Sequence, residues 1–336
     1  MKDIELPRRV IVGDGAIERI GDLVCELALV GDSLVIADPI TAKIAGERVR
    51  SDLGSEIYIL GGSIDHDIQS AIDLIREKNI GYLVGVGGGR VIDITKICAY
   101  KTEIPFLSVP TAASHDGITS PQASLRGRKP VSIRVHSALG ILADTEIIRK
   151  APPRLTAAGC ADAISNYTAV LDWKIAHEKK GEYYGDYAAS LSMMSAQIVM
   201  HNAEKIKNHI DILVEALISS GVAMGIAGSS RPCSGAEHQF SHALDLICPK
   251  PALHGEQCGV GTIMMAYLHG TDWEKVRNAL KTVGAPINSR ELNIDDKYII
   301  RALMMANKIR DRYTILGDGL SKEEAIELAR VTGIIK

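Results

Sequence analysis

The chain has 336 residues, of which 46% are hydrophobic, and its formal net charge is −3. This length and composition are typical of two folded domains and exclude an intrinsically disordered chain. The small net charge argues against a nucleic-acid-binding surface, so any anionic ligand must be held by a local pocket.

The N-terminus and the cysteines indicate a reducing compartment. The first residues, MKDIELPRRV, lack the apolar core of a signal peptide, and no stretch reaches the roughly 20 apolar residues that a membrane span needs. The six cysteines form no C-x-x-C pair, so we predict that they are small, buried, apolar residues. We therefore expect a cytoplasmic protein.

Short apolar runs alternate with helical patterns in the first part of the chain. Strands are expected at 9–12, 34–37, 57–60, 82–86 and 105–109. Helices are expected between them, at 16–29, 41–53, 65–78 and 91–101. This alternation predicts parallel strands with helices on both faces. Two further β-rich segments, 131–135 and 139–143, are interpreted as an appended ribbon.

The pattern changes after Asp144, because long helical periodicities then dominate. Pro152-Pro153 suits a domain boundary, since proline is tolerated at a helix start but not inside a helix. We predict an N-terminal α/β domain, residues 1–150, and a C-terminal all-helical domain, residues 151–336.

A glycine-rich turn follows the expected strand at 82–86. Gly87, Gly88 and Gly89 allow a backbone to approach a phosphate, and the helix that follows offers unpaired N–H groups. The pattern departs from the common dinucleotide fingerprint G-x-G-x-x-G, because Arg90 holds the third glycine's place. A nucleotide pyrophosphate fits this turn; a tight turn without a ligand is the alternative.

Two other segments are candidates for the same ligand. Asp38 follows a strand and suits the ribose of an adenosine, although it could equally cap a helix. The loop 110–121 is rich in hydroxyls, and Thr111, Ser114 and Ser120 suit a cofactor. Asp116 is the carboxylate of this loop and could meet a substrate hydroxyl, but a self-stabilised surface turn is equally compatible with the sequence.

The helical part carries a group of potential metal ligands. His238 and His242 are four residues apart and share one helix face, His254 follows a proline-marked turn, and Asp162 lies on an earlier helix. Two imidazoles and a carboxylate suit Zn²⁺ with an open fourth position, and they would also hold Fe²⁺. Capping or core histidines are the alternative.

The order of these motifs resembles the superfamily of glycerol dehydrogenases, iron-dependent alcohol dehydrogenases and dehydroquinate synthases. The likeness covers nearly the whole chain and implies a Rossmann-like N-terminal domain with a dehydroquinate synthase-like helical domain. The segments 87–93, 111–117 and 162–169 are most similar to the sn-glycerol-1-phosphate dehydrogenase branch. That branch reduces dihydroxyacetone phosphate with NAD(P)H in archaeal lipid backbone synthesis. NAD and NADP both remain open.

The resemblance also implies roles for residues at matching positions. Asp162, His238 and His254 would bind one zinc ion per subunit. Asp116, Asp162 and His242 would contact the substrate and take part in catalysis. The implied cofactor-binding residues are Gly87, Gly88, Gly89, Arg90, Val91, Thr111, Ala112, Ala113, Ser114 and Ser120.

The proton and the substrate phosphate need further groups. His242, outside the implied ligand set, is a candidate proton donor or relay. Asn166, the basic run 126–129 and the stretch 229–231 are candidates for the phosphate, and the basic run is also compatible with a solvated turn. Rival hypotheses are a glycerol dehydrogenase acting on an unphosphorylated polyol, a carbon–oxygen lyase and a non-catalytic NAD-binding protein. A homo-oligomer is expected.

Overall fold

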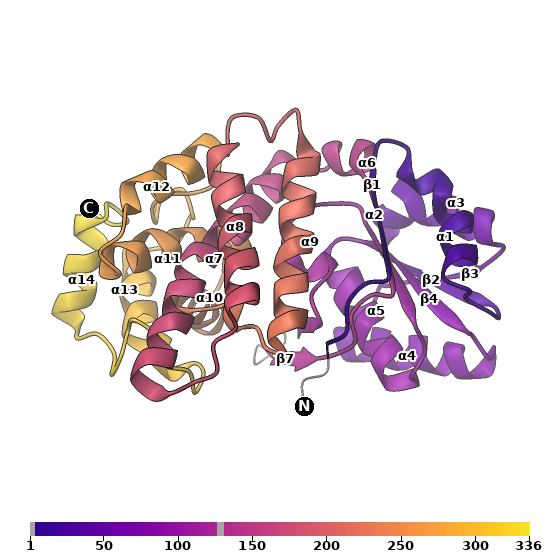
Figure 1. Ribbon diagram of the computed structural model, residues 1–336, viewed down its shortest axis with the longest axis horizontal. Coiled ribbons are helices and arrows are strands. Elements are labelled where there is room, and N and C mark those ends of the chain that lie inside the picture. The colour runs from indigo at the N-terminus through magenta and orange to yellow at the C-terminus, as the bar shows by residue number, and fades with distance from the viewer. Residues whose placement is uncertain (1–3, 126–130) are drawn as a thin grey trace. The chain divides into compact units, whose positions relative to one another are not determined.

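The protein is described from a computed structural model, which defines residues 4–125 and 131–336. Its contacts divide the chain into two compact units, residues 1–152 and residues 153–336. Figure 1 shows a sheet with helices in the first unit and helices in the second.

The N-terminal unit is built on a six-stranded sheet in the order β1-β8-β5-β4-β2-β3, in which every pairing is parallel. The predicted α/β class is thereby confirmed. The strands are β1 (Arg9–Gly13), β2 (Ser33–Ala37), β3 (Glu56–Ile59), β4 (Tyr82–Gly87), β5 (Phe106–Pro110) and β8 (Gly140–Asp144).

Helices cover both faces of this sheet (Figure 1). Along β4, Val84 and Val86 belong to the core cluster that includes Leu23 and Val49, while the alternate residue Gly85 faces Thr95 of α5. This alternation is the side-chain period of a strand buried on both faces. The helices are α1 (Ile20–Glu26), α2 (Pro39–Thr41), α3 (Glu47–Leu53), α4 (Ile64–Glu77), α5 (Gly89–Thr102) and α6 (Thr145–Arg149).

The predicted ribbon of 131–135 with 139–143 is wrong. β7 (Val131–Arg134) pairs antiparallel with β6 (Gln122–Leu125), whereas β8 lies in the main sheet between β1 and β5. The physical reason is burial on both faces: all residues of β8 are buried, and a continuous apolar run suits a central parallel strand better than a ribbon.

The C-terminal unit, all of whose residues are described, consists of helices and connecting turns, as the sequence predicts. The helices are α7 (Pro153–Lys180), α8 (Asp186–His201), α9 (Ile210–Ala227), α10 (Ala236–Ile247), α11 (His254–Leu268), α12 (Trp273–Thr282), α13 (Asp296–Met305) and α14 (Lys322–Val331). Helix α7 begins at Pro153, where the missing N–H has no cost.

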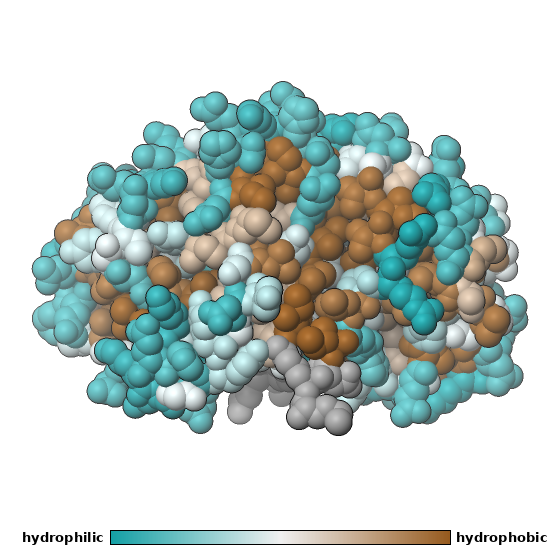
Figure 2. All heavy atoms as spheres, in the orientation of Figure 1, coloured by the Kyte–Doolittle hydropathy of each residue, from teal (hydrophilic) through white to brown (hydrophobic). Residues whose placement is uncertain are grey.

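Within the described residues, α9 is the one helix long and apolar enough to cross a membrane by length and composition. However, 67% of its apolar window is buried, as in the core helix of a folded protein. Figure 2 shows hydrophilic side chains over much of the displayed face, with apolar patches between them, which is ordinary for a folded surface.

Candidate functional site

Four side chains with metal-binding atoms converge inside the helical unit. They are Asp162 from α7, His238 from α10, and His254 and Cys258 from α11. One donor atom from each lies within 4.8 Å of the other three. Nε2 of His254 is 3.7 Å from Oδ1 of Asp162, and the ring centroids of His238 and His254 are 4.9 Å apart. The three residues implied as metal ligands therefore share one small space, together with a thiol.

Hydrogen bonds orient the two imidazoles. Nδ1 of His238 lies 2.9 Å from Oε1 of Glu237, and Nδ1 of His254 lies 3.2 Å from Oγ of Ser241. Glu237 is itself fixed, because its carboxylate accepts hydrogen bonds from Thr168 Oγ1 and from a backbone N–H. An imidazole held through Nδ1 presents Nε2 to a metal, which is the usual arrangement of metal-binding histidines.

The charges around this space favour a cation. Burial alone lowers the pKa of His238, but Cys258 and Glu237 raise that pKa well above its usual value. Burial raises the pKa of Glu237, yet its hydrogen bond with His238 and the charge of that ring leave the pKa lowered. The carboxylate of Glu237 thus places negative charge beside His238 in the interior, which favours a cation bound to the imidazoles and to Asp162.

Glycines allow α11 to approach α7 closely enough to assemble the site. A Cβ on Gly255 would lie 2.7 Å from the carbonyl carbon of Ala158, and one on Gly259 would lie 2.9 Å from Cβ of Ala161. Gly255 directly follows His254, and Ala161 directly precedes Asp162. Because these two glycines have no side chain, the two helices can pack closely at the position of the ligands.

A second basic group lies beside the donor cluster. His242, on the same helix as His238, has its ring centroid 5.7 Å from that of His254. Nη2 of Arg310 lies 3.1 Å from Nε2 of His242. Since a guanidinium only donates, Nε2 of His242 accepts in this contact.

The glycine turn of the N-terminal unit joins β4 directly to α5. Gly87 ends the strand, and Gly88 precedes the helix without any side-chain cap for its first N–H groups. A Cβ on Gly88 would have nothing within 4 Å, whereas one on Gly89 would lie 2.7 Å from the ring of His115. The uncapped helix start beside open space fits the pyrophosphate of a dinucleotide.

The other implied cofactor residues lie at the same edge of the sheet. Gly87 pairs with Pro110 across β4 and β5, so the loop that begins at Thr111 starts beside the glycine turn. The backbone N–H of Thr111 donates to the carbonyl of Gly87 at 3.1 Å. Carboxyl ends of parallel strands are where such folds bind ligands.

The chain is similar along its whole length to curated proteins. The glycerol-1-phosphate dehydrogenases of Methanosarcina acetivorans and Pyrococcus abyssi, both with NAD(P)+ in their names, are each 50% identical to it. The matches cover 99% of this chain and 97% and 99% of those proteins. The chain belongs to the glycerol-1-phosphate dehydrogenase family. Residues 11–152 also match the iron-containing alcohol dehydrogenase family model, which confirms the resemblance stated from the motifs.

Solved structures support the fold of this family member. A probable glycerol dehydrogenase from Sinorhizobium meliloti superposes with a TM-score of 0.81 at 22% identity, covering 100% of both chains. Sulfoacetaldehyde reductase from Bifidobacterium kashiwanohense, solved with NAD+, has a TM-score of 0.77 at 15% identity, again covering 100% of both chains. At 22% and 15% identity, the similarity shows a shared fold and does not show a shared function.

Several predicted residues have structural partners that bear on their roles in this family member. Asp38 caps α2, since its Oδ1 accepts from the backbone N–H groups of Ile40 and Thr41 at 2.8 Å, so the capping alternative describes it. Arg90 is bound to the carboxylate of Asp67 and the carbonyl of Gly62. Both side chains still lie at the carboxyl edge of the sheet, and their roles toward a cofactor stay predictions.

The candidates for the substrate divide between the units. Asp116 begins a short 3-10 helix in the N-terminal unit, while Asn166 is buried in α7 and donates to Ser220 Oγ at 2.8 Å. Arg231, from the stretch 229–231, is paired with Glu182 and donates to a backbone carbonyl. The basic run lies at 126–129, outside the described residues.

Sequence reasoning missed Cys258, Glu237 and Arg310. Cys258 could have been found from its spacing, because it lies four residues after His254 and so on the same helix face. Glu237 directly precedes His238, but adjacency on a helix does not predict a side-chain contact. Nothing local marks Arg310, which belongs to an irregular segment after α13 and reaches His242 only through tertiary packing.

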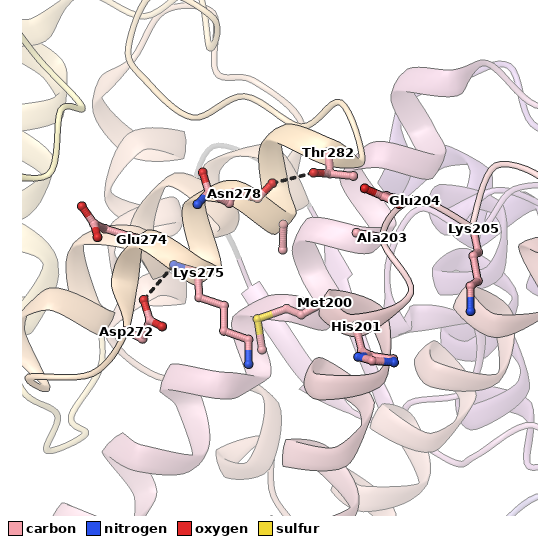
Figure 3. A pocket seen from close by; sticks show the side chains of 11 residues that line it. Met200, His201, Ala203, Glu204, Lys205, Asp272, Glu274, Lys275, Asn278 and Thr282 are labelled. Atoms are coloured by element: carbon pink, nitrogen blue, oxygen red, sulfur yellow. Dashed lines mark hydrogen bonds between the residues drawn. The ribbon is translucent and has the colours of Figure 1, made fainter.

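An open polar groove lies elsewhere on the helical unit (Figure 3). Its wall includes Lys205, Lys275 and Asp272, and none of the four donor residues lines it. Asp272 accepts from the backbone N–H of Lys275 as the N-cap of α12, so this polar group serves the helix end (Figure 3). The groove is therefore separate from the candidate metal site.

Proposed function

We propose that this chain reduces dihydroxyacetone phosphate to sn-glycerol 1-phosphate with NADH or NADPH. One observation carries the proposal: half of its residues are identical, over nearly the full length, to proteins named glycerol-1-phosphate dehydrogenase. The buried donor cluster and the uncapped glycine turn are the parts that such an enzyme requires.

Asp162, His238 and His254 would hold the metal, with Zn²⁺ expected from the donor set. The chemistry that a zinc ion supplies when bound there is polarisation of the substrate's ketone oxygen. Glu237 and Ser241 keep the two imidazoles in position through their Nδ1 atoms. Because these partners are buried and fixed, the ligand geometry is set before any substrate arrives.

The N-terminal unit would bind the nicotinamide cofactor. The N–H groups from Gly88 to Val91 would receive the pyrophosphate, and residues 111–114 with Ser120 would line the cofactor beyond it. The chemistry that the cofactor supplies is hydride transfer. We assign Asp116 to the substrate hydroxyl, as the sequence implies.

Arg310 supports a substrate that carries a phosphate. Its guanidinium is partly buried, which lowers its pKa, and the described residues provide His242 rather than a carboxylate as its partner. Arg231 and Arg154 of the same unit are each paired with a glutamate, and Arg312 uses its donors on a backbone carbonyl and a hydroxyl. A buried cation without an acidic partner is a suitable anchor for an anion, and arginine matches the geometry of phosphate.

His242 is our candidate for the group that returns a proton to the reduced oxygen. In the structure its Nε2 accepts from Arg310, so the transferable proton lies on Nδ1. His242→Ala should lower turnover and flatten its pH profile. An unchanged profile would remove His242 from the proton path.

The decisive assay follows NAD(P)H oxidation with dihydroxyacetone phosphate and with dihydroxyacetone, before and after chelation and zinc readdition. We expect activity on the phosphorylated ketone that is lost on chelation and restored by zinc. Activity on dihydroxyacetone alone would point to a polyol dehydrogenase, and metal-independent cofactor binding without turnover would point to a binding protein.

Arg310→Gln tests the phosphate assignment within the same assay. Loss of a charge-assisted hydrogen bond, worth about 1.5–3 kcal/mol, should raise KM for dihydroxyacetone phosphate roughly 10-fold to 100-fold. The slower reaction with dihydroxyacetone should keep its KM. Arg301→Gln, on the exposed part of α13, is the matched control and should change neither.

We place this enzyme in the cytoplasm as a homo-oligomer, because its cofactor and phosphorylated substrate are intracellular metabolites and such enzymes commonly assemble. Sedimentation of the purified chain at assay concentrations tests the assembly, and a purely monomeric species would contradict it.

A further inference from the structure

Cys258 occupies a position that sets it apart from the other cysteines. It lies on α11 one turn after His254, is fully buried, and points its sulfur into the donor cluster. Its Sγ is 3.6 Å from Nε2 of His254. Among the described residues no other cysteine belongs to such a cluster: Cys98 and Cys160 are buried outside it, and Cys25 is exposed.

We propose that Cys258 is a fourth metal ligand, which completes the set of Asp162, His238 and His254 when no substrate is present. The inference rests on the proposed function for the identity of the metal site, but not for its geometry. On binding the metal, the thiol gives its proton to solvent and coordinates as a thiolate.

The observed distances agree with a tetrahedral zinc site. Zn–S bonds of about 2.3 Å and Zn–N bonds of about 2.0–2.1 Å place sulfur and nitrogen about 3.5 Å apart at a tetrahedral angle. The corresponding distance in the structure is 3.6 Å from Cys258 to His254. Oδ1 of Asp162 and Nε2 of His254, at 3.7 Å, are near the separation that two such ligands need. The four donors thus need only small adjustments to share one ion.

The helix itself explains why the sulfur reaches the site. Residues four apart on a helix lie one above the other, so His254 and Cys258 present their donor atoms on the same side of α11. Gly255 and Gly259 flank them and bring this side against α7 next to Asp162. A side chain of this size at position 258 therefore lines the metal space, and sulfur gives it a donor atom there.

A thiolate ligand changes the expected behaviour of the centre. Three protein ligands would leave the fourth position open, as the sequence predicts, whereas four protein ligands would close the tetrahedron until substrate arrives. The substrate's oxygen then has to enter as a fifth ligand or take the place of the sulfur, as catalytic zinc sites can expand their coordination. Cys258 should also tighten metal retention, so that Cys258→Ser weakens zinc binding at least tenfold in a chelator competition.

Cobalt substitution gives a readout that does not depend on activity. The full chain, stripped of metal and loaded with one Co²⁺, should show the strong near-ultraviolet absorption of a sulfur–cobalt bond. Cys258→Ser should lose this absorption, while the exposed Cys25→Ser and the buried Cys233→Ser should keep it. X-ray absorption of the zinc-loaded chain should show a sulfur neighbour at about 2.3 Å in the unaltered protein.

The proposal is overturned if the unaltered chain binds one cobalt ion without that absorption, or if the absorption survives in Cys258→Ser. Should Cys258→Ser fail to fold, the zinc X-ray absorption of the unaltered chain decides alone, since a shell of only nitrogen and oxygen overturns the proposal. The two proposals can fail separately. If the metal has a sulfur ligand but the chain does not reduce dihydroxyacetone phosphate, only the proposed function is refuted. If the chain is active but its metal has no sulfur ligand, only this inference is refuted.

Discussion

Replacing Gly255 by alanine should disrupt the metal site, because the added methyl group displaces helix α11. The new Cβ would overlap the carbonyl oxygen of Ala158 and lie 2.7 Å from its carbonyl carbon, whereas ordinary contacts begin at 3.4 Å. The distance to the carbon alone must grow by 3.4 − 2.7 = 0.7 Å, and the nearer oxygen requires a larger shift of α11. The obstacle is backbone and cannot rotate away. A metal site tolerates ligand displacements of about 0.2 Å, so a shift of this size misplaces His254 relative to Asp162.

The expected cost has two parts. Overpacking should destabilise the metal-free protein by about 1–3 kcal/mol, although alanine favours a helix more than glycine does. Zinc affinity should fall by roughly a hundredfold. At a zinc concentration of 100 times the original Kd, zinc stabilises the parent by about 2.7 kcal/mol and the variant by about 0.4 kcal/mol, so about 2.3 kcal/mol of ligand-linked stability is lost.

Denaturant unfolding with and without zinc measures both parts, and a chromophoric chelator gives the affinity. Gly21→Ala is the matched control: Gly21 also lies in a helix, but its added Cβ would have nothing within 4 Å. That control should gain up to about 1 kcal/mol or stay unchanged. If Gly255→Ala instead binds zinc as tightly as the parent chain, close packing of α11 on α7 does not position the ligands and our reasoning is wrong.

Three further substitutions test other parts of the structure. Glu237→Gln removes the carboxylate that holds His238, so zinc affinity should fall about 10-fold to 100-fold by chelator competition, with the exposed Glu323→Gln unchanged. Gly88→Ala adds a Cβ into open space, so thermal stability should hold while NADH binding, followed by fluorescence, weakens at least tenfold; unchanged binding would show that no phosphate contacts this turn. Asp38→Asn keeps the helix cap but removes the charge, and should shift preference toward NADPH in parallel kinetic assays; an unaltered NADH/NADPH ratio would restrict Asp38 to capping.

The sheet was largely predictable because its signals are local. The apolar runs at 34–37 and 82–86 are bounded by turn residues, and β2 and β4 lie there in the structure. The position of β8 was not predictable in the same way. Its five residues look like those of any buried strand, and only the pairing with β1 and β5 decides which sheet it joins. Pairing partners depend on the whole chain, which a local pattern does not contain.

The candidate metal site was likewise predictable only where its signals are local. The His238–His242 spacing is visible in the sequence, but the sequence does not decide which of the two joins His254. In the structure His238 belongs to the donor cluster and His242 faces Arg310 instead. Arg310 belongs to the segment after α13, which is held by contacts such as that between Thr314 and Gln239. Residues far apart in the chain thus decide the chemistry of a local motif.

The surroundings of His242 connect the two recognition tasks of the proposed enzyme. Its Nε2 contacts Arg310, while its ring lies 5.7 Å from that of His254 in the donor cluster. A three-carbon ketone phosphate is short, so the group that binds its phosphate must lie close to the group that binds its carbonyl. An arginine joined to the metal cluster through one histidine meets this requirement. An unphosphorylated polyol would leave Arg310 without an anion, and a partly buried charge without a counterion is costly.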